Sequence, residues 1–417
     1  MDNANILWIS PFVPYNSVPH AGGKTELFYI RNILNCNCNL NLITACHTWE
    51  LGKIDPDILE ITKKIIPKDN WTGLLMRIRN FIRIANPFDK YGHVLSPYFK
   101  EGVTKALREC QGKRCFTPDI IVLQWTEAVM LINILKKKFP KSRFIAIEED
   151  VTYLRKERKY NSSSNMITKA YRKIGYNITR RTELSALNNS DVVIVNNYKD
   201  RDLLCKDGIE ENHIFSMCPY YQDFSEIQRI YQNKTIVFYG AMDRSDNEDA
   251  AIWFIEKVFC KLESDFIFMI IGNHPSDRLK SYASDRIIIT GFVDYVGELL
   301  SKAFCFVAPL FIGAGIKIKV LEAMSASLPV LTNEIGIEGI GATDGKEFFL
   351  CKTVRDYLLR IHELENEDIN KSMGKAAKEY ILSNFKKVQK VKEFRDIFTS
   401  LAGYNVAEEF AEVISII

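Results

Sequence analysis

The chain has 417 residues, a hydrophobic content of 47%, a charged content of 26% and a formal net charge of +3. These values exclude a disordered or fibrous chain and predict a folded protein, and the length favours two domains. The net charge is too small to predict a nucleic-acid partner. The sequence contains no apolar run of about 18 residues, so it predicts no membrane span, and its first residues lack the layout of a secretory signal.

Ten cysteines and six histidines are spread along the chain. No C-x-x-C pair occurs, and the histidines show no metal-ligand spacing. Cysteines such as Cys260 and Cys305 lie in apolar runs, where a free thiol behaves as a small hydrophobic side chain. The sequence therefore predicts a cytoplasmic protein with reduced cysteines, no bound metal and no cofactor.

The loop after the first predicted strand reads PFVPYNSVPHAGGKTE. Gly22 and Gly23 stand directly before a helix that is predicted to start near Thr25, and a flexible backbone at a helix N-terminus favours anion binding. A plain junction between loop and helix explains the same residues. Strands in this half of the chain are predicted at 6–10, 40–45, 120–124, 144–147 and 192–196.

Three carboxylates, Glu148, Glu149 and Asp150, follow the predicted strand FIAI. Ligands of parallel sheets bind beyond the carboxyl ends of the strands, so these side chains are candidates for a general base. The alternative is a charged turn that caps a helix beginning near Val151.

Two basic segments contain many apolar residues. Residues 71–88 read WTGLLMRIRNFIRIANPF, and residues 151–185 carry nine Lys or Arg against two Glu. Such segments predict a helix on an anionic membrane surface. An ordinary surface helix with one packed face is the alternative.

A second series of strands is predicted at 236–239, 266–271, 286–289, 304–308 and 329–332. Continuous apolar strands that alternate with helices indicate parallel sheets covered on both faces. We therefore expect an α/β protein of two Rossmann-like domains that face each other across a cleft. The polar stretch Tyr220–Asn233 predicts the linker, with domains at 1–222 and 223–388 and a C-terminal helix at 389–417.

Residues 305–340 predict a strand, a glycine loop with Gly313 and Gly315, and a helix carrying Lys317, Lys319 and Glu322. Loop amides, the helix N-terminus and two lysines favour a phosphate group. Glu322 only accepts hydrogen bonds, which suits a ligand with hydroxyl groups, such as a nucleotide sugar. Glycine turns of this kind also occur in α/β proteins without such a ligand.

The same segment resembles the donor-site signature of the family 4 glycosyltransferases. The matching residues are Pro309-Leu310, Gly313, Gly315, Lys317, Lys319, Leu321-Glu322-Ala323-Met324 and Pro329-Val330. The opening TIVFYGAMDRSDN is similar to the start of that family's donor domain, with Gly240, Arg244 and Asn247 at its marked positions. The stretch IIITGFVDYV resembles a further segment, whose backbone at Val293 faces the base in the family.

The resemblance implies the GT-B fold, transfer with retention, and a last helix that returns to the first domain. It implies a nucleotide-sugar donor and a glycan, a lipid-linked sugar or another hydroxyl acceptor, with no metal ion required. Asp150 is the candidate acceptor base, followed by Glu149 and by His20 in the first loop. The donor-binding candidates are Gly22, Gly23, Gly240, Arg244, Val293, Gly313, Gly315, Ile316, Lys317, Lys319 and Glu322.

One position departs from the family pattern. Ala314 stands where the family commonly has a first glutamate beside the donor sugar, so the sugar cannot be inferred there. Two further hypotheses stay open, a sugar-nucleotide epimerase of the same architecture and a non-catalytic transferase-like subunit. The expected location is cytoplasmic, with peripheral contact to the inner face of the membrane.

Overall fold

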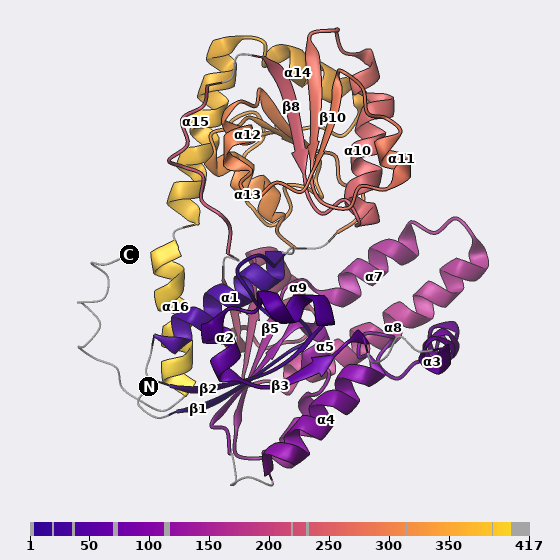
Figure 1. Cartoon of the computed structure of the whole chain (residues 1–417), viewed down its shortest axis with the longest axis vertical. Helices are drawn as coiled ribbons and strands as arrows, with labels where there is room; N and C mark the ends of the chain where they lie inside the picture. Colours follow the sequence, from indigo (N-terminus) through magenta and orange to yellow (C-terminus); the bar gives the residue numbers. More distant parts are fainter. Residues whose placement is uncertain are drawn as a thin grey trace. The chain divides into compact units, whose positions relative to one another are not determined.

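The structure is a computed structural model, and it describes residues 4–18, 21–35, 38–69, 74–111, 117–217, 220–230, 233–313, 315–385 and 387–401. These residues form two compact α/β units. The N-terminal domain holds 4–18, 22–217 and 387–401, and the C-terminal domain holds 220–385. Each is built on a parallel sheet with helices on both faces (Figure 1).

The sheet of the N-terminal domain has seven strands in the order β3-β2-β1-β4-β5-β6-β7. The strands are β1 (Asn5–Ser10), β2 (Asn39–Cys46), β3 (Thr62–Pro67), β4 (Ile120–Gln124), β5 (Arg143–Glu148), β6 (Val192–Val195) and β7 (Ile214–Ser216). The helices are α1 (Ala21–Leu34), α2 (Pro56–Ile61), α3 (Leu74–Ala85), α4 (Pro97–Gln111), α5 (Trp125–Val129), α6 (Ile132–Lys138), α7 (Thr152–Asn161), α8 (Met166–Asn188), α9 (Tyr198–Lys206) and α16 (Lys387–Leu401).

The sheet of the C-terminal domain has six strands in the order β10-β9-β8-β11-β12-β13. The strands are β8 (Lys234–Tyr239), β9 (Phe266–Ile271), β10 (Ile287–Gly291), β11 (Cys305–Ala308), β12 (Val330–Thr332) and β13 (Phe349–Leu350). The helices are α10 (Ser245–Lys257), α11 (Asp277–Lys280), α12 (Gly297–Ser301), α13 (Ile318–Ser325), α14 (Val354–Glu363) and α15 (Glu367–Asn384).

Alternating side chains of the strands build the core on both faces of each sheet. In β1, Ile6 and Trp8 pack into one buried cluster, and Leu7 and Ile9 pack into another on the opposite face. Successive side chains of a strand point to opposite faces, so a strand covered on both sides is apolar throughout. The continuous apolar runs in the sequence have this cause.

The predicted strands are present, and three further strands, β3, β7 and β13, were not predicted. β3 contains two lysines and β7 and β13 have only three and two residues, so none of them forms an apolar run. Two expectations were wrong in detail. Gly22 and Gly23 lie in the first turn of α1 rather than before it, and Cys260 is exposed rather than part of the core.

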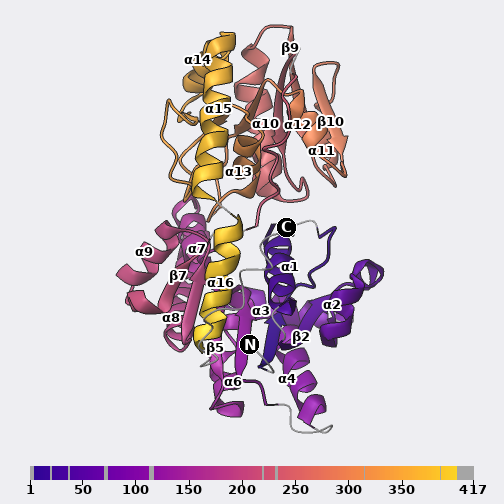
Figure 2. The ribbon, with the colours of Figure 1, turned by 90° about the vertical axis from the view of Figure 1, so that its left-hand side faces the viewer.

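Helix α16 belongs to the N-terminal domain, although it is last in the sequence (Figure 2). Phe394 is fully buried and stacks on Tyr29 of α1, with the ring centroids 4.2 Å apart. Ile397 and Phe398 join the same cluster. Apolar contact with α1 therefore holds the C-terminal helix on the first domain.

We predict that Phe394→Ala lowers the free energy of unfolding by about 3 kcal/mol, because it leaves a cavity where a buried ring packs against Tyr29. Lys392→Ala on the exposed side of α16 is the matched control and should leave stability nearly unchanged. Denaturant unfolding measures both. Equal stabilities of the two variants would contradict this packing.

Candidate functional site

The strand order of the C-terminal sheet determines where the donor-side candidates lie. The chain leaves β8 at its carboxyl end and later returns to add β11 on the other side, so the strand order reverses between these two neighbours. Ligands of doubly wound sheets bind at such a reversal, beyond the carboxyl ends of the strands. Gly240 follows β8 there, and residues 309–317 follow β11 there.

The loop after β11 leads into helix α13 through glycines with positive φ. Gly313 has a φ of +146° and Gly315 a φ of +69°, which side-chain-bearing residues rarely adopt. Lys317 is the N-cap residue of α13, and its side chain does not cap the helix. Among the described residues, the amides of Gly315, Ile316 and Ile318 have no hydrogen-bond acceptor. A helix N-terminus with unused amides attracts an anion.

Lys319 lies in the first turn of α13, and its side chain is enclosed by the end of β8. Its Nζ donates a hydrogen bond of 2.6 Å to Oδ1 of Asn247 and lies 4.6 Å from the ring centroid of Phe238. Gly240 makes this possible, because a Cβ there would be 2.7 Å from the lysine nitrogen. Burial, together with the charges of Arg244 and Lys317, lowers the pKa of Lys319 to about 7.

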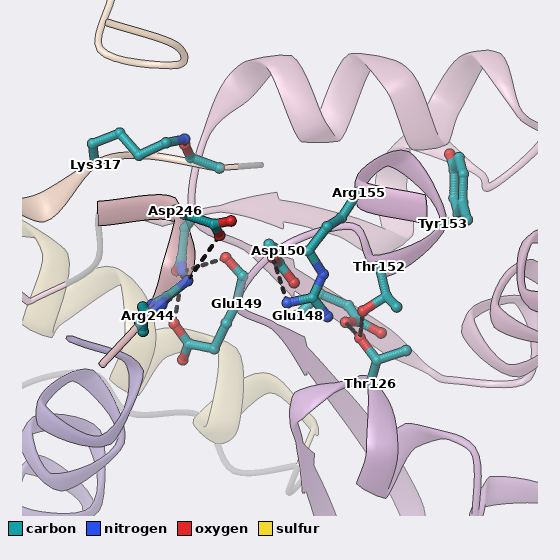
Figure 3. A network of polar contacts seen from close by, with 12 residues as sticks. Thr126, Glu148, Glu149, Asp150, Thr152, Tyr153, Arg155, Arg244, Asp246 and Lys317 are labelled. Atoms are coloured by element: carbon teal, nitrogen blue, oxygen red, sulfur yellow. Dashed lines mark hydrogen bonds and ion pairs between the residues drawn. The ribbon is translucent and has the colours of Figure 1, made fainter. Parts of the chain in front are cut away.

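The other two cations of the set lie around Lys319. Lys317 bonds to the carbonyl oxygen of Gly315, and its Nζ lies 3.8 Å from a carboxylate oxygen of Glu338. Arg244 precedes α10 with a largely exposed guanidinium group, 3.8 Å from Asp246 (Figure 3). Three cations whose charges act on one another favour a ligand with more than one negative charge.

Glu322 stands one turn further along α13 and is buried. One carboxylate oxygen accepts a hydrogen bond of 3.0 Å from the amide of Gln222, and the other accepts one from the hydroxyl of Tyr239. Burial and the charge of Glu322 raise the pKa of Tyr239, so the phenol keeps its proton. Glu322 therefore ties the first residues of the domain to α13. Val293 follows β10 and packs on the same core.

The N-terminal domain places its candidates at the carboxyl end of its own sheet. Glu149 accepts hydrogen bonds from Nε2 of Gln124 at 2.5 Å and from Nδ2 of Asn196 at 2.9 Å. Burial, together with the charge of the neighbouring Asp150, raises its pKa to about 8. Asp150 pairs with Arg155 at 3.6 Å (Figure 3).

Gly22 and Gly23 lie in the first turn of α1. A Cβ on Gly22 would lie 2.2 Å from a ring carbon of Trp125 and 3.2 Å from the carboxyl carbon of Glu149, so only glycine fits there. Gly23 is the next residue of α1. His20 lies outside the described residues, and so does Ala314.

A further carboxylate, Glu26, lies close to this group and was not predicted. It is fully buried in α1 and accepts hydrogen bonds from Nε1 of Trp8 at 3.1 Å and from the hydroxyl of Ser10 at 2.8 Å. Burial raises its pKa well above the usual value, and the charge of Glu149 adds to this. Its partners are at least 16 residues away in the chain, so no local pattern could have revealed it.

Glu148 belongs to a second buried network. The hydroxyl of Thr126 donates to Glu148 and lies 2.8 Å from the hydroxyl of Thr152, as Figure 3 shows. Glu183 of α8 accepts the backbone amides of Thr152 and Tyr153 at the start of α7, at 2.8 and 3.0 Å. Burial raises the pKa of Glu183 to about 8 and that of Glu148 well above its usual value. This network holds the turn that carries Glu149 and Asp150.

Neither a metal cluster nor a membrane span occurs in the part of the chain that the structure describes. Within that part, no group of three His, Cys, Asp or Glu side chains is arranged to hold a metal ion. None of its helices is both long enough and apolar enough to cross a bilayer.

Comparison with known protein families matches residues 233–365 to the family "Glycosyl transferases group 1". An uncharacterized 44.6 kDa protein in the cps region of Klebsiella pneumoniae is 27% identical over 206 residues, which cover 46% of this chain and 50% of that protein. Trehalose synthase of Thermococcus litoralis is 26% identical over 167 residues, which cover 40% and 36%. The chain thus spans half or less of the length of these relatives.

Among solved structures, HepE of Anabaena in complex with UDP and glucose resembles the chain with a TM-score of 0.65. The two are 11% identical, and the match covers 95% of this chain and 100% of that one. This likeness shows the fold, two Rossmann-like domains of the GT-B type. Together with the family match, it supports a glycosyltransferase.

The raised carboxyl pKa values predict that stability falls as pH rises. Unfolded glutamates ionise near 4.5, whereas folded Glu149 and Glu183 keep their protons up to about 8. Between these pH values the glutamates of the unfolded chain are ionised, whereas the two folded glutamates still hold their protons. A rise in pH therefore stabilises the unfolded chain, and the free energy of unfolding decreases from about pH 4.5 to 8. Melting temperatures across this range measure the slope.

Glu149→Gln should make that slope shallower, because it removes a carboxyl whose ionisation is opposed by burial. Glu60→Gln, at an exposed position of α2, is the matched control and should keep the wild-type slope. A Glu149→Gln slope equal to that of wild type would show that the carboxyl ionises normally in the folded domain.

Proposed function

We propose that this protein transfers a hexose-type sugar from a nucleotide diphosphate donor to a hydroxyl acceptor, with retention of configuration. The observation that carries the proposal is the set of three cations, Arg244, Lys317 and Lys319, at the uncapped N-terminus of α13. Burial favours the neutral form of Lys319, and a diphosphate that binds beside it favours the protonated form. The family match over the same residues and the UDP bound by HepE support this interpretation.

In this proposal each donor-side residue has a role that follows from its chemistry. The amides of Gly315 and Ile316 and the three cations hold the diphosphate, and Glu322 accepts hydrogen bonds from the ribose hydroxyls. Gly240 gives Lys319 its room, and Gly313 gives the loop its turn. The backbone near Val293 is proposed to contact the base. Gly22 brings the start of α1 close to Glu149, and Gly23 follows it in the same turn.

The reaction breaks the bond between the anomeric carbon and a phosphate oxygen and forms a bond to the acceptor oxygen. Negative charge develops on the departing diphosphate while the sugar becomes oxocarbenium-like. Cations and amides fixed at the leaving group stabilise that charge without reorganisation. In a retaining transfer the departing phosphate accepts the proton of the acceptor hydroxyl, so no protein base is required.

The N-terminal carboxylates are proposed to act on the acceptor. Because burial raises the pKa of Glu149 to about 8, this residue is mostly protonated at neutral pH and donates a hydrogen bond to an acceptor oxygen. Asp150, paired with Arg155, is the better candidate for a base if one is needed. His20 remains a candidate acceptor-side residue from the sequence.

The direct experiment incubates the full chain with UDP-, GDP- and ADP-linked hexoses and with acceptor extracts, and it measures free nucleoside diphosphate. Release that depends on the acceptor supports transfer, and the anomeric configuration of the product tests retention. An altered sugar nucleotide would instead show an epimerase. Binding without turnover under all conditions would show a non-catalytic subunit.

Lys319→Met should lower the turnover rate by roughly 100-fold, because it removes a preorganised cation from the leaving group. Lys257→Met, at an exposed position of α10, is the matched control and should keep wild-type turnover. Steady-state rates of diphosphate release measure both. Comparable rates for the two variants would remove Lys319 from the donor site.

The affinity for UDP should also report the titration of Lys319. A bound diphosphate raises the lysine pKa from its value of about 7 in the free protein, so this contribution to affinity is complete below pH 7 and decreases as pH rises above it. Calorimetry between pH 6 and 9 should show the decrease in wild type and its absence in Lys319→Met. Parallel pH profiles for both proteins would contradict the assignment.

Glu322→Gln should weaken UDP binding by roughly tenfold or more, because the amide offers fewer acceptors to the ribose hydroxyls. Its melting temperature should exceed that of Glu322→Ala, which also leaves the amide of Gln222 and the hydroxyl of Tyr239 without their acceptor. Calorimetry and thermal unfolding separate the two effects. Wild-type affinity in Glu322→Gln would limit Glu322 to a structural role.

A further inference from the structure

Helix α3 presents its apolar side chains to solvent. Phe81 is 73% exposed and Ile82 is 63% exposed, and Ile78 lies beside them, one turn earlier. A surface helix of a globular domain normally turns this stripe toward the core. In the part of α3 whose side chains the structure describes, Ile78, Phe81, Ile82 and Ile84 are exposed, whereas Arg83 is half-buried.

Basic residues fix the helix in this orientation. Nη2 of Arg79 pairs with a carboxylate oxygen of Glu101 in α4 at 3.1 Å, and Nη1 of Arg83 donates to the carbonyl oxygen of Leu95 at 2.9 Å. Both arginines come from the side of α3 that is opposite to Phe81. The exposed apolar stripe is therefore held outward by specific polar contacts.

The start of α8 adds a second exposed apolar group. Met166 is 84% exposed and Ile167 is 83% exposed, in the first turn after the short connection from α7. The hydroxyl of Tyr171 in α8 bonds to the carbonyl oxygen of Ile84 in α3. Its ring also stacks on His93, with centroids 6.2 Å apart. The first turns of α8 and helix α3 thus lie side by side (Figure 1).

We name this surface the α3–α8 patch. It consists of Ile78, Phe81, Ile82, Phe88, Met166 and Ile167. Its two segments, residues 74–90 and 158–173, carry nine Lys or Arg against a single Asp. Lys169 and Lys173 of α8 are both exposed, and their Nζ atoms lie 5.7 and 6.0 Å from the ring centroid of Tyr160 in α7.

We propose that the α3–α8 patch docks on the surface of an anionic lipid bilayer. Large apolar side chains that protrude singly among cations fit the boundary between headgroups and acyl chains, where the side chains enter the lipid and the cations contact phosphates. A protein partner would more often meet a contiguous apolar area with few charges. The excess of Lys and Arg in these two segments favours a surface of anionic lipids. The inference does not depend on sugar transfer.

Co-sedimentation of the full chain with vesicles tests the proposal. Vesicles that contain phosphatidylglycerol should retain the protein, and vesicles of phosphatidylcholine alone should retain roughly tenfold less. Phe81→Ser/Ile82→Ser and Met166→Ser/Ile167→Ser should each weaken binding to the anionic vesicles by roughly tenfold or more. Lys169→Gln/Lys173→Gln should weaken binding and reduce its dependence on salt.

The control is Leu59→Ser, which removes an apolar residue of α2 in the same domain that is 53% exposed, and it should bind as wild type does. Circular dichroism confirms that each variant is folded. Equal binding to neutral and anionic vesicles, or patch variants that bind like Leu59→Ser, would overturn the proposal. So would a dimer in solution that the patch variants convert to monomer while no vesicle retains the protein, because the occupant would then be a second copy.

Discussion

The proposed function depends on the positive charge of Lys319 and the two cations near it. The ammonium group is enclosed between α13 and the end of β8, and it donates a hydrogen bond to the neutral amide oxygen of Asn247. The charges of Arg244 and Lys317 also act on it. Isolated burial of a charge is unfavourable, so the site lowers the lysine pKa while no anion is present. In the proposed function, a ligand with two phosphates removes that penalty, which would favour polyanions at this site.

The fold determines why these groups meet. Parallel pairing brings the carboxyl ends of all strands to one edge of a sheet, and the reversal of strand order beside β8 opens that edge next to β11. Gly240 and the loop at 313–317 come from positions more than 70 residues apart, yet the sheet brings both to Lys319. The same topology in the N-terminal domain gathers Glu26 and Glu149 beside Trp125.

Much of this was predictable from the sequence, and the exceptions have physical causes. The buried strands could be predicted because a strand covered on both faces is apolar at every position. The donor-side candidates could be proposed from the sequence because glycines, lysines and Glu322 follow one another within ten residues. Glu26 and the Glu148–Thr126 pair could not, since their partners are distant in the chain. Strand β3 was missed because two lysines interrupt its apolar pattern, and β7 and β13 were missed because they have only three and two residues.

The orientation of α3 could not be predicted from the sequence either. Its pattern of Ile, Phe and Arg fits a helix packed by its apolar side equally well, and only the contacts of Arg79 and Arg83 show that the basic side faces the domain. Tertiary polar contacts therefore decide which side of an amphipathic helix is exposed. Glu322 is a similar case. It accepts hydrogen bonds from the amide of Gln222 and the hydroxyl of Tyr239, and no sequence motif indicates this structural role.

Hydrogen exchange with and without UDP tests the central claim most directly. If the N-terminus of α13 and the cations around it hold a diphosphate, added UDP should slow exchange in peptides that cover 313–322 and 239–247 and leave β3 and α4 unchanged. Exchange in those two peptides that is the same with and without saturating UDP, or protection that appears only elsewhere, would contradict the account.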